Sequence, residues 1–241
     1  MKYVIGDVHG NYKSLQKLKS ELNENSELIF VGDLVDRGKS SREVVKFVRE
    51  NEYKCTLGNH EFMMIDYGES FIKEYPNRVP LNYIASWLSC GGKETLLSYE
   101  LIKIEDDRVV INEDSRYFDN FISDINWMKN LPLYIEFEES ISNKKVVVSH
   151  SCISNVWEKR DNKEFADMFE EYALWYRDEA SIDSEIFNIF GHTPIEFGAD
   201  IKKHYANIDT GCFIKNEDFG ILSAFCIENQ EVISVKRDEN D

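Results

Sequence analysis

The chain has 241 residues, of which 42% are hydrophobic and 13% aromatic, enough apolar material for one substantial core. Its 45 Asp and Glu residues outnumber its 28 Lys and Arg residues and give a net charge of −17. This charge repels nucleic-acid backbones, and no basic stripe overcomes it, so we expect no polynucleotide partner. No apolar run reaches the length needed to span a bilayer, so we expect no membrane partner either.

The cysteines give an indication of the cellular compartment. Five are present, an odd number, and they are widely spaced without a C-x-x-C pair. This pattern favours neither a disulfide framework nor a zinc ribbon. We expect no targeting segment ahead of the first apolar run. We therefore expect reduced thiols and a cytoplasmic location.

The first third of the chain alternates short apolar runs with amphipathic segments. The apolar runs at 3–5, 28–31 and 54–57 predict strands. Apolar residues at helical spacing predict helices over 11–23, from Ser40 or Ser41 onward, and over 61–75. Three strand and helix alternations favour a parallel α/β core with its site at the carboxyl ends of the strands. Pro76 and Pro80 then interrupt the pattern.

The rest of the chain is predicted to contain an insertion and a second group of strands. Residues 77–130 carry no candidate ligands and are expected to form a mostly helical insertion flanking the site. Further strands are predicted at 133–137, 145–148, 187–190 and about 204–208, 219–227 and 231–236, with a helix over 164–175. Because the candidate ligands are spread along the chain, we expect one catalytic domain over 1–236 and an acidic tail at 237–241.

Polar residues with metal-binding chemistry follow directly after several apolar runs. Asp7 and His9 at i and i+2 can point the same way where a strand ends, and an oxygen with an imidazole nitrogen suits a small divalent metal. The bracketing glycines allow sharp turns close to metal and phosphate. We infer a two-metal site. Its motifs are GDVHG at 6–10, GDLVDRG at 32–38, GNHE at 58–61, SH at 149–150 and GHT at 191–193.

This ordered set of motifs resembles the phosphoprotein phosphatase family of dinuclear metallophosphoesterases. The wider superfamily shares the GD, GNH and GH pieces, whereas DRG after GDLV and Glu61 after Asn-His are typical of the narrower family. The segments 87–92 (WLSCGG) and 95–99 (TLLSY) are similar to a bacterial clade of serine/threonine phosphatases and diadenosine tetraphosphate hydrolases. The resemblance implies the calcineurin-like α/β fold, with two mixed β-sheets packed face to face and flanked by helices.

The resemblance also implies the metal ligands. It makes Asp33 a bridge between two divalent ions, for which we expect Mn²⁺, with Fe or Zn²⁺ as alternatives. The two ions would share a solvent molecule and lower its pKa, giving a hydroxide that attacks phosphorus directly. The implied ligands are Asp7, His9 and Asp33 for one ion, and Asp33, Asn59, His150 and His192 for the other.

The remaining roles come from the same resemblance. His60 is expected to protonate the leaving oxygen as general acid, with Asp36 holding it in place and keeping it protonated. Arg37 and Arg177 are expected to bind the non-bridging phosphate oxygens with their planar guanidinium groups. Arg177 rests on the stretch LWYRD at 174–178, similar to a stretch ahead of GHT in the bacterial clade.

Two further residues have expected supporting roles. Asn59 is counted as a substrate-binding residue as well as a metal ligand. Asp209, in the segment 207–213 that matches the closing strand of the family, is expected to orient a ligand histidine.

Two substrate classes fit these motifs, because both reactions need the same nucleophile and the same phosphate clamp. Phosphoserine and phosphothreonine on proteins are favoured, and symmetrical hydrolysis of diadenosine tetraphosphate is the alternative. An inactive scaffold that binds phosphorylated partners is a weaker alternative. The presence of every ligand together with His60 and Asp36 disfavours that scaffold.

Overall fold

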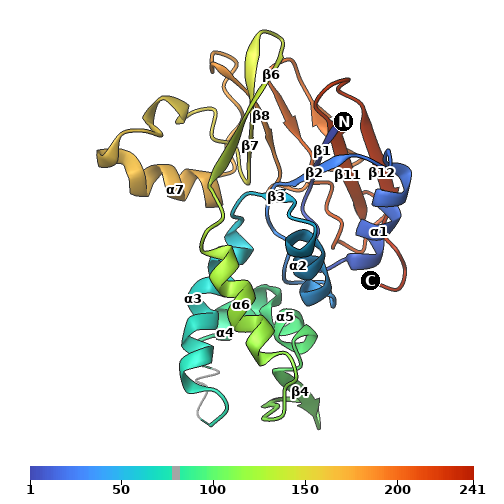
Figure 1. Cartoon of the computed structure of the whole chain (residues 1–241), viewed down its shortest axis with the longest axis vertical. Helices are drawn as coiled ribbons and strands as arrows, with labels where there is room; N and C mark the ends of the chain where they lie inside the picture. The colour runs from blue at the N-terminus through green and yellow to red at the C-terminus, as the bar shows by residue number, and fades with distance from the viewer. Residues whose placement is uncertain (78–81) are drawn as a thin grey trace.

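Two five-stranded sheets form the centre of the computed structural model, which describes residues 1–77 and 82–241 (Figure 1). Pro80 therefore lies outside the described residues. The first sheet has the order β12-β11-β1-β2-β3, and the second the order β6-β7-β8-β10-β9. The first contains β1 (Lys2–Ile5), β2 (Glu27–Phe30), β3 (Lys54–Cys55), β11 (Ile221–Cys226) and β12 (Val232–Lys236). The second contains β6 (Tyr134–Ile141), β7 (Lys144–Ser149), β8 (Ile186–Phe190), β9 (Asp200–Ile201) and β10 (Tyr205–Asn207).

Both sheets are mixed and pack face to face, which confirms the expected fold. In the first, β1, β2 and β3 run parallel while β11 and β12 pair antiparallel. In the second, β7, β8 and β10 run parallel, with β6 and β9 antiparallel at the edges. One buried cluster contains Val4 and Ile29 from the first sheet and Val148 and Ile189 from the second. Burial of these apolar faces holds the two sheets together.

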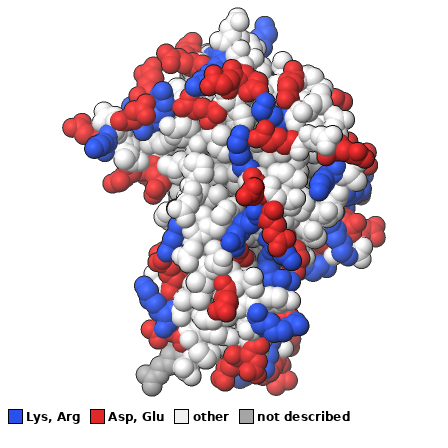
Figure 2. All heavy atoms as spheres, viewed as in Figure 1, with Lys and Arg blue, Asp and Glu red and all other residues white. Residues whose placement is uncertain are grey.

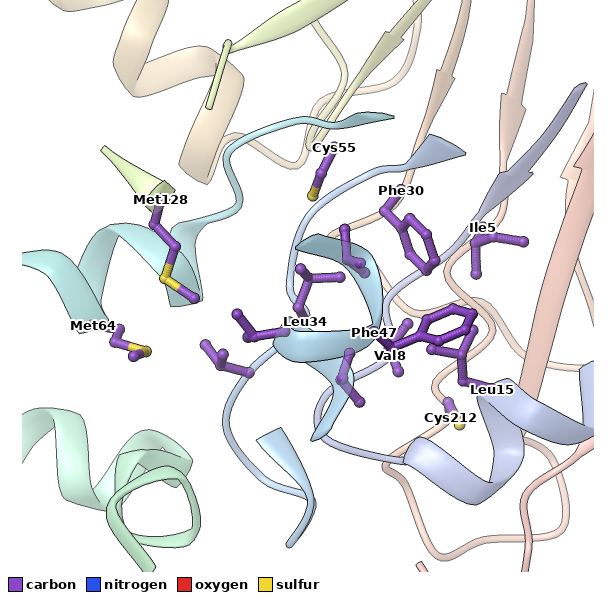
Figure 3. Close-up of a cluster of buried hydrophobic side chains, with 14 of the residues drawn as sticks. Ile5, Val8, Leu15, Phe30, Leu34, Phe47, Cys55, Met64, Met128 and Cys212 are labelled. Carbon is purple, nitrogen blue, oxygen red and sulfur yellow. The ribbon is translucent and has the colours of Figure 1, made fainter. Parts of the chain in front are cut away.

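Helices cover the outer faces of both sheets. On the first sheet, α1 (Tyr12–Glu21) and α2 (Ser41–Glu50) bury Leu15 and Phe47 against Ile5 and Phe30 (Figure 3). On the second, α7 (Ala166–Trp175) packs its apolar side on β7 and β8. The parallel strands of each sheet are thus covered on both faces, as their nearly continuous apolar sequences require.

Residues 82–133, between α3 (Asn59–Glu74) and β6, form a separate helical layer at the lower end of the molecule (Figure 1). It contains α4 (Ala85–Trp87), a π-helical turn η1 (Leu88–Gly92), α5 (Lys93–Ser98) and α6 (Phe118–Met128). It also contains a hairpin of β4 (Ile102–Glu105) and β5 (Arg108–Ile111), which the sequence did not predict. The hairpin turns through Asp106 and Asp107, both in left-handed conformation at φ 48° and 60°, a geometry that favours two-residue hairpin loops.

The start of α3 differs from the sequence prediction, which placed it at Glu61. The helix begins at Asn59, so Asn59 and His60 lie in its first turn rather than in the preceding loop. Helix geometry, and not the end of β3, therefore fixes the directions of these two side chains.

The segment 237–241 folds back onto α1. The Asp241 carboxylate accepts hydrogen bonds from the backbone N–H groups of Lys13 (3.0 Å) and Ser14 (2.7 Å). Asn11, at the N-cap position of α1, makes no capping hydrogen bond with its own side chain. Asp241 therefore serves as the side-chain cap of α1 from the far end of the chain.

The surface carries charged side chains of both signs. Acidic and basic side chains are interspersed over the face in Figure 2, and the outline is hollowed between α7 and α3. Each of the five cysteines is a free thiol. Among the described helices, none combines the length and the apolar character needed to cross a membrane.

Candidate active site and metal centre

The six residues expected to bind metal come together at the carboxyl ends of the strands. Asp7 and His9 follow β1, and Asp33 follows β2. Asn59 opens α3, while His150 and His192 follow β7 and β8 of the second sheet. The site therefore lies where the edges of both sheets meet, as the α/β pattern predicted.

Asp33 lies at the centre of this group and directs one carboxylate oxygen to each side. Its Oδ2 is 3.4 Å from Nε2 of His9, and its Oδ1 is 3.4 Å from Nε2 of His150. Asp33 has a left-handed backbone conformation, φ 50°, which turns the chain sharply after β2. Two oxygens facing two separate groups of nitrogen atoms are the arrangement expected of a bridging carboxylate.

His150, His192 and Asn59 form the group on the Oδ1 side. Nε2 of His150 lies 2.8 Å from Oδ1 of Asn59 and 3.1 Å from Nδ1 of His192. Nδ1 of His192 lies 3.0 Å from the same Asn59 oxygen. Two imidazole nitrogens and an amide oxygen thus converge on one point beside Asp33.

Asp7 connects the group on the Oδ2 side with the His192 loop. Its Oδ2 is 4.0 Å from Nε2 of His9, and both of its carboxylate oxygens are 3.2 Å from the backbone N of His192. A Cβ atom on Gly191 would lie 2.0 Å from Oδ1 of Asp7. Only glycine at position 191 lets the two loops approach this closely.

Backbone carbonyl groups set the orientation of the three histidines that are expected to bind metal. Each ring donates one N–H outward and turns its other, unprotonated nitrogen toward the centre. Burial lowers the pKa of His9 and of His150, and burial together with the charge of His150 lowers the pKa of His192 to about 3. All three are therefore neutral at pH 7, the form that binds metal. The pairs are His9 Nδ1 with Val35 O (2.8 Å), His150 Nδ1 with Val31 O (3.0 Å) and His192 Nε2 with Trp175 O (3.2 Å).

The expected role of Asp209 is wrong, because backbone carbonyls orient the histidines in its place. Its Oδ1 accepts a hydrogen bond from the backbone N–H of Gly211 (2.9 Å). Asp209 does contribute to the electrostatics of the site. Burial raises the pKa of Asp7 well above its ordinary value, and the charges of Asp209 and Asp33 raise it further.

The donor set fits a pair of divalent metal ions. Asp7, Asp33 and Asp209 are each at most 2% exposed, and a buried group of carboxylates is unfavourable unless cations compensate its charge. Carboxylate oxygen, amide oxygen and neutral imidazole nitrogen are donors that Mn²⁺, Fe and Zn²⁺ accept. By distance, one potential metal-binding group is His9, Asp33 and His60, with His60 where the sequence resemblance implies Asp7, and the other is Asp33, His150 and His192.

His60 faces the same centre but is paired with Asp36. Its Nδ1 donates to Oδ2 of Asp36 at 2.7 Å, while its Nε2 lies 4.0 Å from Oδ2 of Asp33. Burial lowers the pKa of His60, but the charges of Asp33 and Asp36 outweigh burial and hold it above its ordinary value. A protonated imidazole that presents Nε2–H to the centre is suited to giving up a proton.

Arg37 and Arg177 are placed differently. The Arg37 guanidinium donates to Nε2 of His9 at 2.9 Å and stacks 3.9 Å above the ring of Phe213. Arg37 therefore uses the same lone pair of His9 that a metal would use, and it must release His9 when metal binds. Arg177 is exposed, and within residues 1–77 and 82–241 no hydrogen bond or ion pair joins it to another side chain. The carbonyl of nearby Trp175 contacts His192, so the backbone around Arg177 borders the centre.

Glu61 supports the site in a way the sequence did not predict. Its buried carboxylate accepts hydrogen bonds from four backbone N–H groups, so it fixes the turn after β2 relative to the start of α3. Burial and the charge of Asp33 raise the pKa of Glu61, while the N–H groups oppose that rise. An acid at the third helical position was the available signal, since it is the position of a capping box. The four donors are Asp33 N (2.7 Å), Leu34 N (2.7 Å), Gly58 N (3.1 Å) and Val35 N (3.3 Å).

An open cleft of about 440 Å³ leads to the centre from the hollow between α7 and α3. Trp175 is 41% exposed and Phe62 36%, and their ring centroids are 6.4 Å apart across the two helices. The cleft thus combines a polar floor with aromatic walls. Its lining consists of Arg37, Asn59, His60, Met63, Ser89, Cys90, Gly91, Trp175 and Phe213.

The relatives of this chain are named for two different activities. The asymmetrical bis(5'-nucleosyl)-tetraphosphatase PrpE of Bacillus velezensis is 28% identical, covering 97% of this chain and 91% of that protein. Serine/threonine-protein phosphatase 2 of Salmonella typhimurium is 29% identical, covering 94% and 92%. The symmetrical bis(5'-nucleosyl)-tetraphosphatase of Erwinia tasmaniensis is 32% identical over 65% of this chain, but the chain spans only 46% of its length.

Solved structures and a family model agree on the fold. A protein serine/threonine phosphatase from Saccharomyces cerevisiae with similarity to human phosphatase PP5 superimposes with a TM-score of 0.57 at 15% identity, covering 98% of this chain and 79% of that one. The family model of calcineurin-like phosphoesterases matches residues 3–219. The chain belongs to the calcineurin-like phosphoesterase family.

Proposed function

We propose that this phosphoesterase removes phosphate from phosphoserine and phosphothreonine side chains of proteins. The observation that carries the proposal is the buried His60–Asp36 pair, 2.7 Å between Nδ1 and Oδ2, beside Asp33. A serine or threonine alkoxide is a poor leaving group and depends on protonation as the P–O bond breaks. A dedicated, charged acid at the metal centre is what such a substrate needs.

The fold family uses a dinuclear metal centre, and we assign its ligands to residues of this chain. Asp33 would bridge the two ions, which we expect to be Mn²⁺, with Fe or Zn²⁺ as alternatives. When bound, the ions would supply Lewis acidity that neutralises phosphate charge and lowers the pKa of water. Asp7, His9 and Asp33 would hold one ion, and Asp33, Asn59, His150 and His192 the other.

Three side chains are proposed to bind the phosphate group. Arg37 lies on the cleft wall, where its stacking on Phe213 presents the planar guanidinium to non-bridging oxygens. Asn59 turns Oδ1 to the histidines, which leaves its Nδ2 group for a phosphate oxygen. Arg177 would reach the phosphate from the α7 side of the cleft.

His60 and Asp36 would then complete the reaction. As hydroxide forms a bond to phosphorus and the bond from phosphorus to the leaving oxygen breaks, the Nε2–H of His60 would give its proton to that leaving oxygen. Asp36 stays hydrogen-bonded to Nδ1 and holds the ring in place. The residues that bind the phosphate and the residue that protonates the leaving group are thus separate sets.

Dinucleoside tetraphosphate hydrolysis is the second candidate, and the aromatic wall of the cleft favours it. Trp175 lines the cleft and is 41% exposed, and stacking of a nucleobase on an aromatic side chain contributes about 1–3 kcal/mol. Of the two relatives that match over 91% and 92% of their length, one is named as a tetraphosphatase and the other as a serine/threonine-protein phosphatase. Their names therefore support both candidates equally.

A kinetic panel with one variant separates the candidates. We expect kcat/KM for a phosphoserine peptide to exceed that for diadenosine tetraphosphate, and Trp175→Ala to change the peptide value no more than Ile104→Ala, an exposed control on β4. If the dinucleotide is preferred by orders of magnitude and Trp175→Ala removes that preference, the second candidate is correct. Binding of the phosphopeptide without hydrolysis would instead identify a scaffold.

A further inference from the structure

Side chains of the helical insertion donate hydrogen bonds to Asp36, the partner of His60 in the proposed general-acid pair. We propose that Trp87 and Thr95 are positioning residues that fix the Asp36 carboxylate and, through it, the imidazole of His60. This inference rests on the proposed role of His60 as general acid. It assigns a function to the segment 87–95, which contains no metal ligand and whose side chains at 87 and 95 are fully buried.

Three donors hold the two oxygens of the Asp36 carboxylate. Nε1 of Trp87 donates to Oδ2 at 2.9 Å, the same oxygen that accepts the 2.7 Å hydrogen bond from Nδ1 of His60. The hydroxyl of Thr95 donates to Oδ1 at 2.6 Å. The carboxylate therefore cannot rotate without breaking one of these bonds, and its plane determines where the His60 ring can lie.

The backbone of Asp36 is held by the same group of residues. Asp36 has φ 70°, a left-handed conformation that residues with a Cβ atom adopt only where the surroundings impose it. Its N–H lies 2.9 Å from Oγ1 of Thr95 and 3.1 Å from Oγ of Ser41, and these two hydroxyls are 3.1 Å apart. Thr95 thus contacts both the backbone and the side chain of Asp36.

The packing around Trp87 fixes the position of its indole ring. Its ring stacks parallel to Tyr67, with centroids 6.3 Å apart, and a Cβ atom on Gly92 would lie 2.4 Å from the indole. Because Trp87 is fully buried and outside the cleft lining, it cannot contact substrate and acts only through Asp36. A rigid indole with one N–H at its edge is well suited to hold a carboxylate at a fixed place.

The test is the leaving-group dependence of kcat. Trp87→Phe keeps a ring in the core but removes the donor, so we expect kcat on a phosphoserine peptide to fall about tenfold, part of the ~10²–10⁴-fold effect of a general acid. Nitrophenolate leaves without protonation, so kcat on p-nitrophenyl phosphate should change less than about twofold. An equal loss on both substrates, or no loss on either, would overturn the inference.

Thr95 provides a second and less disruptive variant. Thr95→Val removes the hydroxyl at nearly constant volume and should show the same leaving-group bias, that is, a larger loss of kcat on the phosphoserine peptide than on p-nitrophenyl phosphate. Thr95→Ser keeps the donor and should restore the peptide activity. The control is Tyr99→Phe, which removes a buried hydroxyl bonded to Asp124 (2.6 Å) in the same layer and should show no bias. Failure of Thr95→Ser to rescue, or an equal bias in Tyr99→Phe, would show a purely structural role.

Two comparisons keep this inference separate from the proposed function. If His60→Asn itself shows no leaving-group bias, the acid is elsewhere and the proposed function fails first. If His60→Asn is biased but Trp87→Phe and Thr95→Val are not, only the present inference fails. In an Asp36→Asn background, Trp87→Phe should add no further bias, because the group it positions is already altered.

Discussion

The two halves of the active site are supported by different kinds of contact. In the metal-binding half, backbone groups orient the side chains: the carbonyls of Val35, Val31 and Trp175 each hold one histidine. In the general-acid half, side chains hold side chains, with Trp87 and Thr95 fixing Asp36. The residues of the metal-binding half follow strands or open α3, whereas in the general-acid half the supporting side chains come from the helical insertion.

This difference has a functional meaning. Val31 and Val35 lie in the turn after β2 and Trp175 ends α7, so the backbone of the fold orients the proposed metal ligands. The general-acid half depends on a few individual side chains from the helical insertion. We infer that the first half decides whether any phosphate ester is cleaved, and the second half decides which leaving groups are tolerated.

The largest expected effect is in the metal-binding half. Chelation, or His192→Ala, should reduce kcat on p-nitrophenyl phosphate and on a phosphoserine peptide alike, by more than about 10³-fold, because the ions contribute several kcal/mol to the transition state. Addition of Mn²⁺ should restore the chelated enzyme. Full activity in protein shown by elemental analysis to be free of metal would contradict the assignment.

A smaller effect is expected at Glu61, which joins the two halves through backbone N–H groups. Glu61→Gln replaces one acceptor oxygen by an amide N–H₂ facing those donors, so the free energy of unfolding should fall by about 3 kcal/mol. The matched control is Glu69→Gln on the same helix, a half-buried residue paired with Lys129. There the change should stay within about 1 kcal/mol. Equal values for the two variants in urea denaturation would show that Glu61 does not hold the turn.

The smallest expected effect concerns the C-terminal segment behind the first ligand loop. Asn11 donates to the carbonyls of Val8 (2.7 Å) and His9 (3.0 Å), and Arg237 donates to Asn11 (3.0 Å). The cap from Asp241 anchors this segment on α1.

Asp241→Ala should therefore destabilise the protein by about 1 kcal/mol, the typical contribution of a helix cap. Exposed Glu239→Ala is the control for loss of charge in the same segment and should change the free energy of unfolding by less than about 0.5 kcal/mol. A control effect as large as that of Asp241→Ala would indicate a general charge effect in place of capping.

The convergence of the residues expected to bind metal could be predicted from the sequence, because each of them lies within a few residues of a short apolar run or in a compact motif. Asp33 and His150, for example, come three residues after the end of β2 and one residue after the end of β7. The alternation of strands and helices then brings these ends to one edge. Local sequence patterns are enough to locate functional residues that lie at the ends of strands and helices.

The rest required the structure because it depends on contacts between distant segments. Nothing in the sequence links Trp87 to Asp36, 51 positions away, or shows which nitrogen of a histidine faces inward. The hairpin β4–β5 was missed because four-residue strands give a weak periodic signal within a helical layer. Likewise, the exposure of Arg177 depends on how the chain leaves α7, and no motif encodes that.

The most direct test of this account is the leaving-group dependence of His60→Asn with its metal content. We predict that kcat falls about 10²–10⁴-fold on a phosphoserine peptide but much less on p-nitrophenyl phosphate, because only the alkoxide needs a proton. Bound metal should stay near two equivalents by elemental analysis. An equal loss on both substrates, together with loss of metal, would show that His60 is a metal ligand and would contradict the separation of the two halves.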